Sequence, residues 1–213
     1  MNRLSIFLLS VVLSFNAFAQ VSKENPYEMI EQVAEITFKR VANSQDAIKS
    51  NPNMLKDVVR EELIPYVDYR YAALKVLGTN LKKIDKKDLN EFIPVFKEYL
   101  ITSYGQVFTL YNNQELRFEP SKDLANKKIV AIQTLVIESG REPISIAFKV
   151  RKNRKTNEWR AFDMIAEGVS LLDSKQAELS SLIRQKGLPY VTDILKKKSE
   201  QDISFSNTGE SAN

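Results

Sequence analysis

The spacing of the apolar residues changes twice along this chain, and this change limits the folds that the chain can adopt. Apolar residues recur every three or four positions over residues 25–111, which is the spacing of one helix face. Over residues 116–165 they alternate with polar residues or form short β-branched runs, which is typical of strands. Helical spacing returns from residue 169. One block of strands between two blocks of helices predicts an α+β protein, with several helices packed on one face of an antiparallel sheet.

Four helices are predicted in the first block. The Asn-Pro pairs at 25–26 and 51–52 each have the order of a cap followed by a proline that begins a helix. A third segment, 67–77, ends at Gly78, which favours a left-handed cap. The longest helical pattern spans about residues 88–111. This block therefore supplies the helices that cover the sheet.

Four strands are predicted in the middle block, at residues 116–118, 129–137, 144–150 and 159–165. Ser-Gly-Arg at 139–141 predicts a tight reversal between the second and third strands, and Lys-Thr-Asn a reversal before the fourth. Short connections of this kind predict a four-stranded antiparallel meander. Two further helices are expected after it, from Val169 to Ile183 and from Leu188 to Leu195.

The N-terminus has the pattern of a secretory signal. Residues 4–15 are almost wholly apolar, and Ala-Phe-Ala at 17–19 fits a signal peptidase site. The apolar run is shorter than the roughly 20 residues that a spanning helix needs. We therefore predict a cleaved signal peptide at 1–19, a single domain at 20–198, and a flexible tail at 199–213.

Cysteine and histidine are both absent from the sequence. Their absence excludes thiol nucleophiles, disulfides, Cys-ligated zinc and Ser-His-Asp catalysis, and it removes the commonest ligand of transition metals. Six glycines leave little room for a phosphate-cradling loop. The formal net charge of +4 is too small to indicate nucleic acid. We expect no metal, no cofactor and no nucleic-acid partner.

Residue types and spacing leave several functions open. The apolar residues of strand 144–150 would line either a dry core or a ligand cavity. In a small exported enzyme, Asp163 would act as a general base. Its alternative role is to accept hydrogen bonds that fix the Glu-Gly-Val-Ser turn after it. An exported adaptor or chaperone without a small ligand is a further class.

Several sequence blocks narrow this choice. Asn-Pro-Tyr at 25–27, Glu-Leu-Ile-Pro-Tyr-Val at 62–67 and Ser-Tyr-Gly-Gln at 103–106 occur in the helical half. Trp-Arg-Ala-Phe-Asp-Met-Ile-Ala-Glu-Gly-Val-Ser follows at 159–170, and Thr-Asp-Ile-Leu-Lys-Lys at 192–197. In this order the blocks closely resemble the MlaC family of periplasmic phospholipid carriers, and block 159–170 is the most specific. The resemblance extends from about residue 25 to residue 198.

This resemblance implies a function without covalent chemistry. Members of the family hold the acyl chains of a phospholipid in a deep apolar cavity between sheet and helices, with the head group near the surface. They pass lipid between an inner-membrane ABC transporter complex that contains MlaD and an outer-membrane complex of MlaA and a porin. The expected ligand is therefore phospholipid, the expected compartment is the periplasm, and the expected role is to maintain outer-membrane lipid asymmetry.

Ten residues are expected at the lipid site under this resemblance. The alternative for each is an ordinary core position. Tyr104 and Trp159 carry polar tips that suit a cavity mouth. The other eight are expected to line the cavity, from the sheet and from the helices above it: Ile146, Phe148, Val150, Tyr71, Leu74, Val95, Tyr99 and Val107.

Two clusters of basic residues are candidates for partner contacts. One lies at the end of the third strand and its turn, where Arg151 and Lys152 are the predicted partner-binding residues. The alternative for both is a solvated turn. For the second cluster, the four lysines between positions 82 and 87, simple solvation is the favoured interpretation.

Overall fold

The sheet confirms the predicted fold class. The computed structural model describes residues 21–205, so the predicted signal peptide and tail residues 206–213 lie outside the described residues. The strands are β1 (Glu115–Phe118), β2 (Ile129–Ile137), β3 (Ile144–Lys152), β4 (Trp159–Ala166) and β5 (Val169–Ser170). They form one antiparallel sheet in chain order. The four predicted strands are present, together with a fifth strand of two residues.

The short fifth strand replaces the predicted start of a helix. Val169 and Ser170 pair with the end of β4, and α6 (Leu171–Lys186) begins after them. Ser170 caps α6, because its hydroxyl accepts the backbone N–H of Asp173 at 3.0 Å. The predicted helix start at Val169 is therefore two residues early.

One face of strand β2 is covered and the other is exposed. Along β2, Val130, Ile132 and Thr134 are buried, whereas Ala131 and Gln133 on the other face are exposed. Side chains alternate between the two faces of a strand, so this pattern identifies the inner face. The pairing of β3 with β4 is interrupted by a bulge between Lys149 and Val150.

The N-terminal helices lie across this inner face. Helix α1 (Pro26–Asn43) begins where the Asn-Pro pair predicts, and the Asn25 side chain accepts the Tyr27 N–H at 3.0 Å. The predicted second helix is instead a series of short elements around Pro65, which has no N–H to donate. These elements are α3 (Met54–Val58), a π-helical turn η1 (Val59–Leu63) and a 3-10 turn η2 (Ile64–Tyr66), and a short helix α2 (Gln45–Ser50) precedes them.

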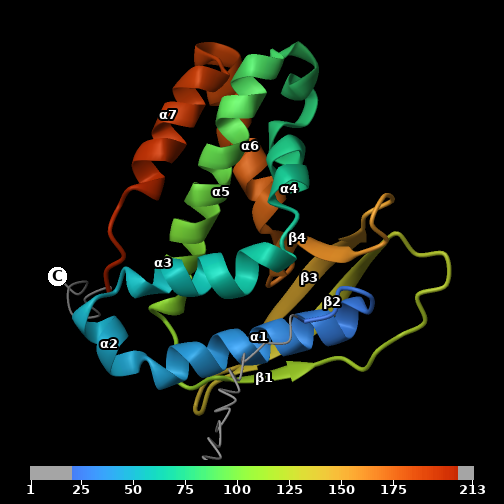
Figure 1. Cartoon of the computed structure of the whole chain (residues 1–213), viewed down its shortest axis with the longest axis vertical. Coiled ribbons are helices and arrows are strands. Elements are labelled where there is room, and N and C mark those ends of the chain that lie inside the picture. The colour runs from blue at the N-terminus through green and yellow to red at the C-terminus, as the bar shows by residue number, and fades with distance from the viewer. Residues whose placement is uncertain (1–20, 206–213) are drawn as a thin grey trace, which may run out of the picture.

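Four helices form a bundle beside the sheet. They are α4 (Tyr69–Leu77), α5 (Lys86–Phe108), α6 and α7 (Leu188–Ser199), with a 3-10 segment η3 (Gly78–Lys83) after α4. Gly78 and Gly187 follow α4 and α6 and have φ values of +54° and +82°, a region that favours glycine. The bundle rises from the β4 side of the sheet, while α1 crosses in front of the strands (Figure 1). Among the helices that the structure describes, none combines the length and the apolar character needed to cross a bilayer.

The C-terminal segment packs against the helices. Ile203 is 4% exposed and joins a cluster with Val41, Ile48 and Leu55. Its backbone N–H donates to the Asn53 side chain at 3.0 Å. The prediction of a flexible tail is therefore wrong for residues 199–205, because one apolar residue in a polar stretch carries no periodic signal.

Replacing Ile203 with Ala is expected to lower the free energy of unfolding by about 2–3 kcal/mol, since a buried Ile side chain leaves a cavity. Phe205→Ala is the control, because Phe205 is 42% exposed and its change should stay within about 0.5 kcal/mol. Urea denaturation followed by circular dichroism measures both. Equal midpoints for Ile203→Ala and wild type would show that the segment contributes nothing to the core.

Candidate functional site

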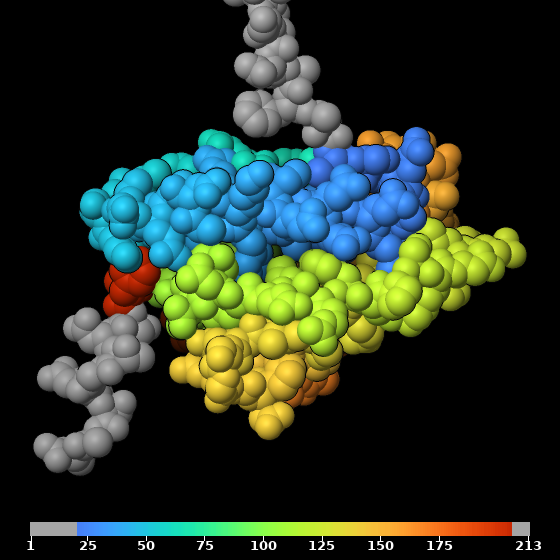
Figure 2. All heavy atoms as spheres, turned by 90° about the horizontal axis from the view of Figure 1, so that it is seen from below, coloured from blue at the N-terminus to red at the C-terminus, as the bar shows by residue number. Residues whose placement is uncertain are grey.

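An apolar cavity of about 210 Å³ lies between the inner face of the sheet and α1. We call it the sheet cavity. Seen from below, α1 and the chain that leads into β1 lie side by side along this region (Figure 2). Its lining is almost entirely aliphatic or aromatic and comes from α1, the η1–η2 segment, the C-terminal end of α5, and the strands. The polar members are Thr37, Tyr66, Tyr104, Thr134 and Asp163.

Four of the ten residues predicted for the lipid site line the sheet cavity. Ile146 and Phe148 stand on the inner face of β3, opposite Thr134 and Ile132 of β2. Tyr104 and Val107 come from the last turns of α5, and Val107 is 53% exposed at the edge of the cavity. The remaining six lie elsewhere.

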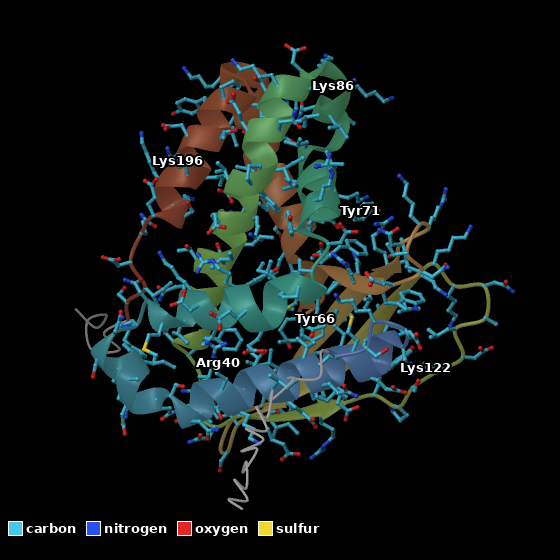
Figure 3. All side chains as sticks on the ribbon, in the orientation of Figure 1. Arg40, Tyr66, Tyr71, Lys86, Lys122 and Lys196 are labelled. Atoms are coloured by element: carbon cyan, nitrogen blue, oxygen red, sulfur yellow. The ribbon has the colours of Figure 1, made fainter. Side chains whose placement is uncertain are left out.

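Three of those six lie in the bundle rather than over the sheet. All three pack against the bundle core: Leu74 and Val95 lie on faces of α4 and α5 that α6 and α7 cover, whereas Tyr71 lies where the bundle meets β4. Tyr71 stacks edge-on against Phe162 at the base of the bundle, with 5.0 Å between ring centroids (Figure 3). The apolar face of a helix does not show which neighbouring element covers it, so these residues were expected at the sheet and lie at the bundle instead.

Val150 and Trp159 belong to solid core. Both are almost fully buried, at 0% and 2% exposure, in the cluster between the N-terminal part of α1 and the sheet. Tyr66 closes this part of the interface, and its hydroxyl accepts the Val21 N–H at 3.1 Å (Figure 3). Val150 lies on the same face of β3 as Ile146 and Phe148, but the N-terminal part of α1 packs directly against its end of the strand. The sheet cavity therefore ends before Val150.

Aromatic residues of the cavity wall were missed from the sequence. Phe38 of α1 and Phe108 of α5 both line the sheet cavity, and their ring centroids lie 5.7 Å apart. Phe38 also meets Tyr111 at 5.3 Å. The spacing of Ile30, Ala34 and Phe38 along α1 is the signal that could have identified this face.

A second cavity of about 340 Å³ adjoins the first. We call it the bundle cavity. It lies among α4, α5, the start of α6 and β4, and Tyr99, the last of the predicted residues, lines it. The two cavities share a wall made of the same side chains, which are Val67, Tyr104, Phe162, Asp163 and Met164. They are therefore neighbouring compartments rather than separate sites.

Tyr104 lies in the shared wall as a neutral phenol. Burial raises its pKa to about 12, and the nearby charge of Asp163 and the neighbouring Tyr99 add to the increase. The group therefore keeps its proton at physiological pH. Among residues 21–205, no protein atom accepts a hydrogen bond from its hydroxyl.

Asp163 organises the turn between β4 and α6. Its two oxygens accept the Ser170 hydroxyl at 2.7 Å and the Leu172 N–H at 3.0 Å. The Lys149 ammonium lies 3.1 Å from the same carboxylate. All of these partners hold the turn together, so the geometry favours the structural role for Asp163 over proton abstraction.

Of the two predicted partner-binding residues, Arg151 makes its contacts within the protein itself. Its guanidinium lies 2.5 Å from the Asp68 carboxylate and 4.2 Å from the centroid of the Tyr71 ring. Asp68 in turn caps α4 by accepting the Tyr71 N–H at 3.1 Å. Arg151 thus links β3 to the start of α4. Lys152 is half-buried, with its ammonium 6.0 Å from the Trp159 ring.

Arg151→Glu is expected to lower the free energy of unfolding by about 1–2 kcal/mol, because it places a second carboxylate beside half-buried Asp68. Lys152→Glu should change it by less than about 0.5 kcal/mol. Chemical denaturation of the two single variants measures the difference. Equal stability of the two would mean that the Arg151–Asp68 pair does not support the fold.

The second basic cluster stands far from both cavities. Lys86 marks the end of the bundle that is remote from the sheet (Figure 3). All four lysines between positions 82 and 87 are exposed. Within residues 21–205, no group of three or more acidic side chains is arranged to hold a metal ion.

A family model described as the MlaC protein matches residues 31–197 of this chain. The chain belongs to the MlaC family. The matched region includes the whole sheet and every cavity-lining residue except Ile30. Proteins of the MlaC family bind and transport lipid and are not enzymes, which agrees with the structural role of Asp163.

Individual relatives agree with this assignment. The chain is 31% identical over 203 residues to the intermembrane phospholipid transport system binding protein MlaC of Haemophilus influenzae, covering 95% of this chain and 94% of that protein. It is 21% identical over 165 residues to the toluene tolerance protein ttg2D of Pseudomonas putida, covering 76% and 75%. MlaC relatives are periplasmic proteins.

A solved structure shares the fold. The phospholipid-binding protein of Ralstonia solanacearum, determined in complex with a phospholipid, superposes with a TM-score of 0.72. The match covers 82% of this chain and 97% of that chain at 17% sequence identity. At this identity, the likeness supports the common architecture of sheet and helices.

Proposed function

We propose that this MlaC-family chain is a periplasmic phospholipid carrier. It is exported by the signal peptide at residues 1–19 and shuttles phospholipid between an outer-membrane MlaA complex and an inner-membrane ABC transporter complex that contains MlaD. This traffic maintains the lipid asymmetry of the outer membrane. The observation that carries the proposal is the apolar cavity between α1 and the inner face of the sheet in a member of a lipid-binding family.

The chemistry of this cavity suits acyl chains. Apolar surface is presented by Ile146, Phe148, Val107 and Phe38, and residues 21–205 hold no cluster of metal-ligating side chains. Each buried methylene contributes about 0.8 kcal/mol, so two long chains are held far too tightly to escape into water at a useful rate. Hand-over to a membrane complex therefore requires direct protein contact.

The cavity must enlarge to admit a whole lipid. Its 210 Å³ is below the roughly 300–1,000 Å³ that is usual for sites of drug-sized ligands. The adjoining bundle cavity, separated only by shared side chains such as Tyr104 and Met164, supplies the nearest additional space. We expect α1 to move away from the sheet as the chains enter.

The proposed partner contact is the basic end of β3. Lys152 is available there, and Arg154 and Lys155 in the following turn are exposed. Arg151 holds this end of β3 against the start of α4 through its ion pair with Asp68. Clustered cations of this kind accelerate encounter with an acidic surface and set its orientation.

Organic extraction of the protein purified from periplasm tests the proposal. We expect about one intact phospholipid per protein, because a site that shields both chains from water retains its ligand through purification. The purified carrier should also pass this lipid to liposomes that contain the MlaD complex. Protein that is folded but free of lipid would favour the adaptor or chaperone, and a chemically altered lipid would favour an enzyme.

A further inference from the structure

The two cavities differ in polarity in the same way as the two parts of a phospholipid. The sheet cavity has an almost wholly apolar lining. The bundle cavity has an apolar inner part and also Ser103, Ser174, Lys175 and Glu178 in its wall. Lys175 and Glu178 do not line the sheet cavity. The adjoining compartments thus form one amphipathic site.

The charge at the bundle cavity favours an anion. The Lys175 ammonium pairs with Glu178 and lies 5.3 Å from the centroid of the Tyr99 ring. Lys198 approaches the same carboxylate at 3.8 Å, so two ammonium groups share one carboxylate. The Lys175 side chain is only 22% exposed, which keeps its charge close to the cavity.

The other carboxylate in the wall is already compensated. Asp163 is paired with Lys149 and accepts two further hydrogen bonds from Ser170 and Leu172. Its charge is therefore offset within the fold and leaves Lys175 as the cationic group that faces the cavity. An anionic group of a ligand in the bundle cavity would pair with the Lys175 ammonium.

A hydrogen-bond donor stands at the boundary between the compartments. Tyr104 lines both cavities, and in the described part of the chain its hydroxyl has no protein acceptor. In a diacyl lipid the ester carbonyls lie between the phosphodiester and the chains. The site therefore matches the lipid from one end to the other. The sheet cavity corresponds to the acyl chains, Tyr104 to the ester groups and Lys175 to the phosphate.

We infer that the bundle cavity receives the phosphodiester head group of the lipid, with Lys175 contacting the phosphate and the Tyr104 hydroxyl donating to an ester carbonyl, while the acyl chains occupy the sheet cavity. This inference rests on the proposed carrier function and gives the bound lipid an orientation. It also makes Lys175 the residue that distinguishes phospholipid from neutral lipid with the same chains.

Lipids that differ in one group test the role of Lys175. Delipidated full-length mature protein is titrated with dioleoyl phosphatidylglycerol and with dioleoylglycerol, which lacks the phosphate. Wild type should bind the phospholipid at least about fivefold more tightly, as expected for a charge-assisted contact. Lys175→Gln should reduce this preference to within about twofold without changing the affinity for dioleoylglycerol. Lys197→Gln, which removes an exposed lysine paired with Asp193 on α7, is the control.

An ether lipid tests the role of Tyr104. Tyr104→Phe should weaken binding of the diester phospholipid by about fivefold, because a single neutral hydrogen bond is removed. Binding of the dialkyl ether analogue, which lacks the carbonyls, should stay unchanged. Tyr190→Phe is the matched control, because Tyr190 is 48% exposed on α7.

The outcomes separate this orientation from the carrier function itself. A Lys175→Gln protein that keeps the full preference, or a Tyr104→Phe protein that loses diester and ether lipids equally, would overturn the orientation. Wild type that binds both dioleoyl lipids equally would overturn it and leave the carrier function in place. Wild type that binds neither lipid would overturn both.

Discussion

The free energy of unfolding is expected to fall by about 3–5 kcal/mol when Asp163 is replaced with Ala, the size found when one partner of a buried ion pair is removed. Asp163 is 7% exposed, and its loss leaves the Lys149 ammonium and the Leu172 N–H without this partner. It also releases the Ser170 hydroxyl that caps α6. The whole turn from β4 to α6 depends on this one carboxylate.

Thermal and urea unfolding of three variants measure this effect. Asp163→Asn keeps an acceptor for the Leu172 N–H and should lose less stability than Asp163→Ala. Asp173→Ala, at an exposed position in the first turn of α6, should cost less than about 1 kcal/mol. An Asp163→Ala protein as stable as Asp173→Ala would show that other contacts hold the turn. Asp163→Asn protein that still delivers lipid to acceptor membranes would also count against an acid–base role.

Two tryptophan substitutions on the same strand are expected to have opposite effects. Ile146 faces the sheet cavity, so the ring of Ile146→Trp can enter space that acyl chains would occupy. This variant should keep a cooperative transition near that of delipidated wild type and lose most of its co-purified phospholipid. Val150 lies in packed core at 0% exposure, and overfilling such a position costs about 1–3 kcal/mol. Val150→Trp should therefore melt at a lower temperature.

Differential scanning fluorimetry and phosphorus analysis of the purified variants measure the two effects together. Phosphorus per protein should fall sharply for Ile146→Trp and remain near the wild-type value in the folded fraction of Val150→Trp. The reverse pattern, with Ile146→Trp strongly destabilised and still loaded, would place the acyl chains outside the sheet cavity.

Local chemistry made much of the fold predictable. The Asn-Pro start of α1 and the end of α4 at Gly78 follow from backbone preferences that need no tertiary context. The β-branched run of β2 and the alternation along β3 likewise identified the strands. Ile146 and Phe148 line the sheet cavity together because alternate residues of a strand share one face.

The positions that were misjudged depend on contacts distant in sequence. Leu74 and Val95 have the spacing of a covered helix face, but α6 and α7 cover them instead of the sheet. Val150 alternates in step with Ile146, and the sequence does not show that α1 packs closely against Val150 and leaves a cavity beside Ile146. Arg151 appeared to be a surface charge because its partner Asp68 lies 83 residues away.

Photo-crosslinking with a phospholipid that carries a diazirine near the end of one acyl chain tests the central claim most directly, namely that the chains lie between α1 and the inner face of the sheet. Peptide mapping should place the crosslinks on the cavity walls, at residues 30–38 of α1, 104–108 of α5 and 146–148 of β3. Crosslinks confined to the exposed outer face of β2, at Ala131 and Gln133, would contradict the account.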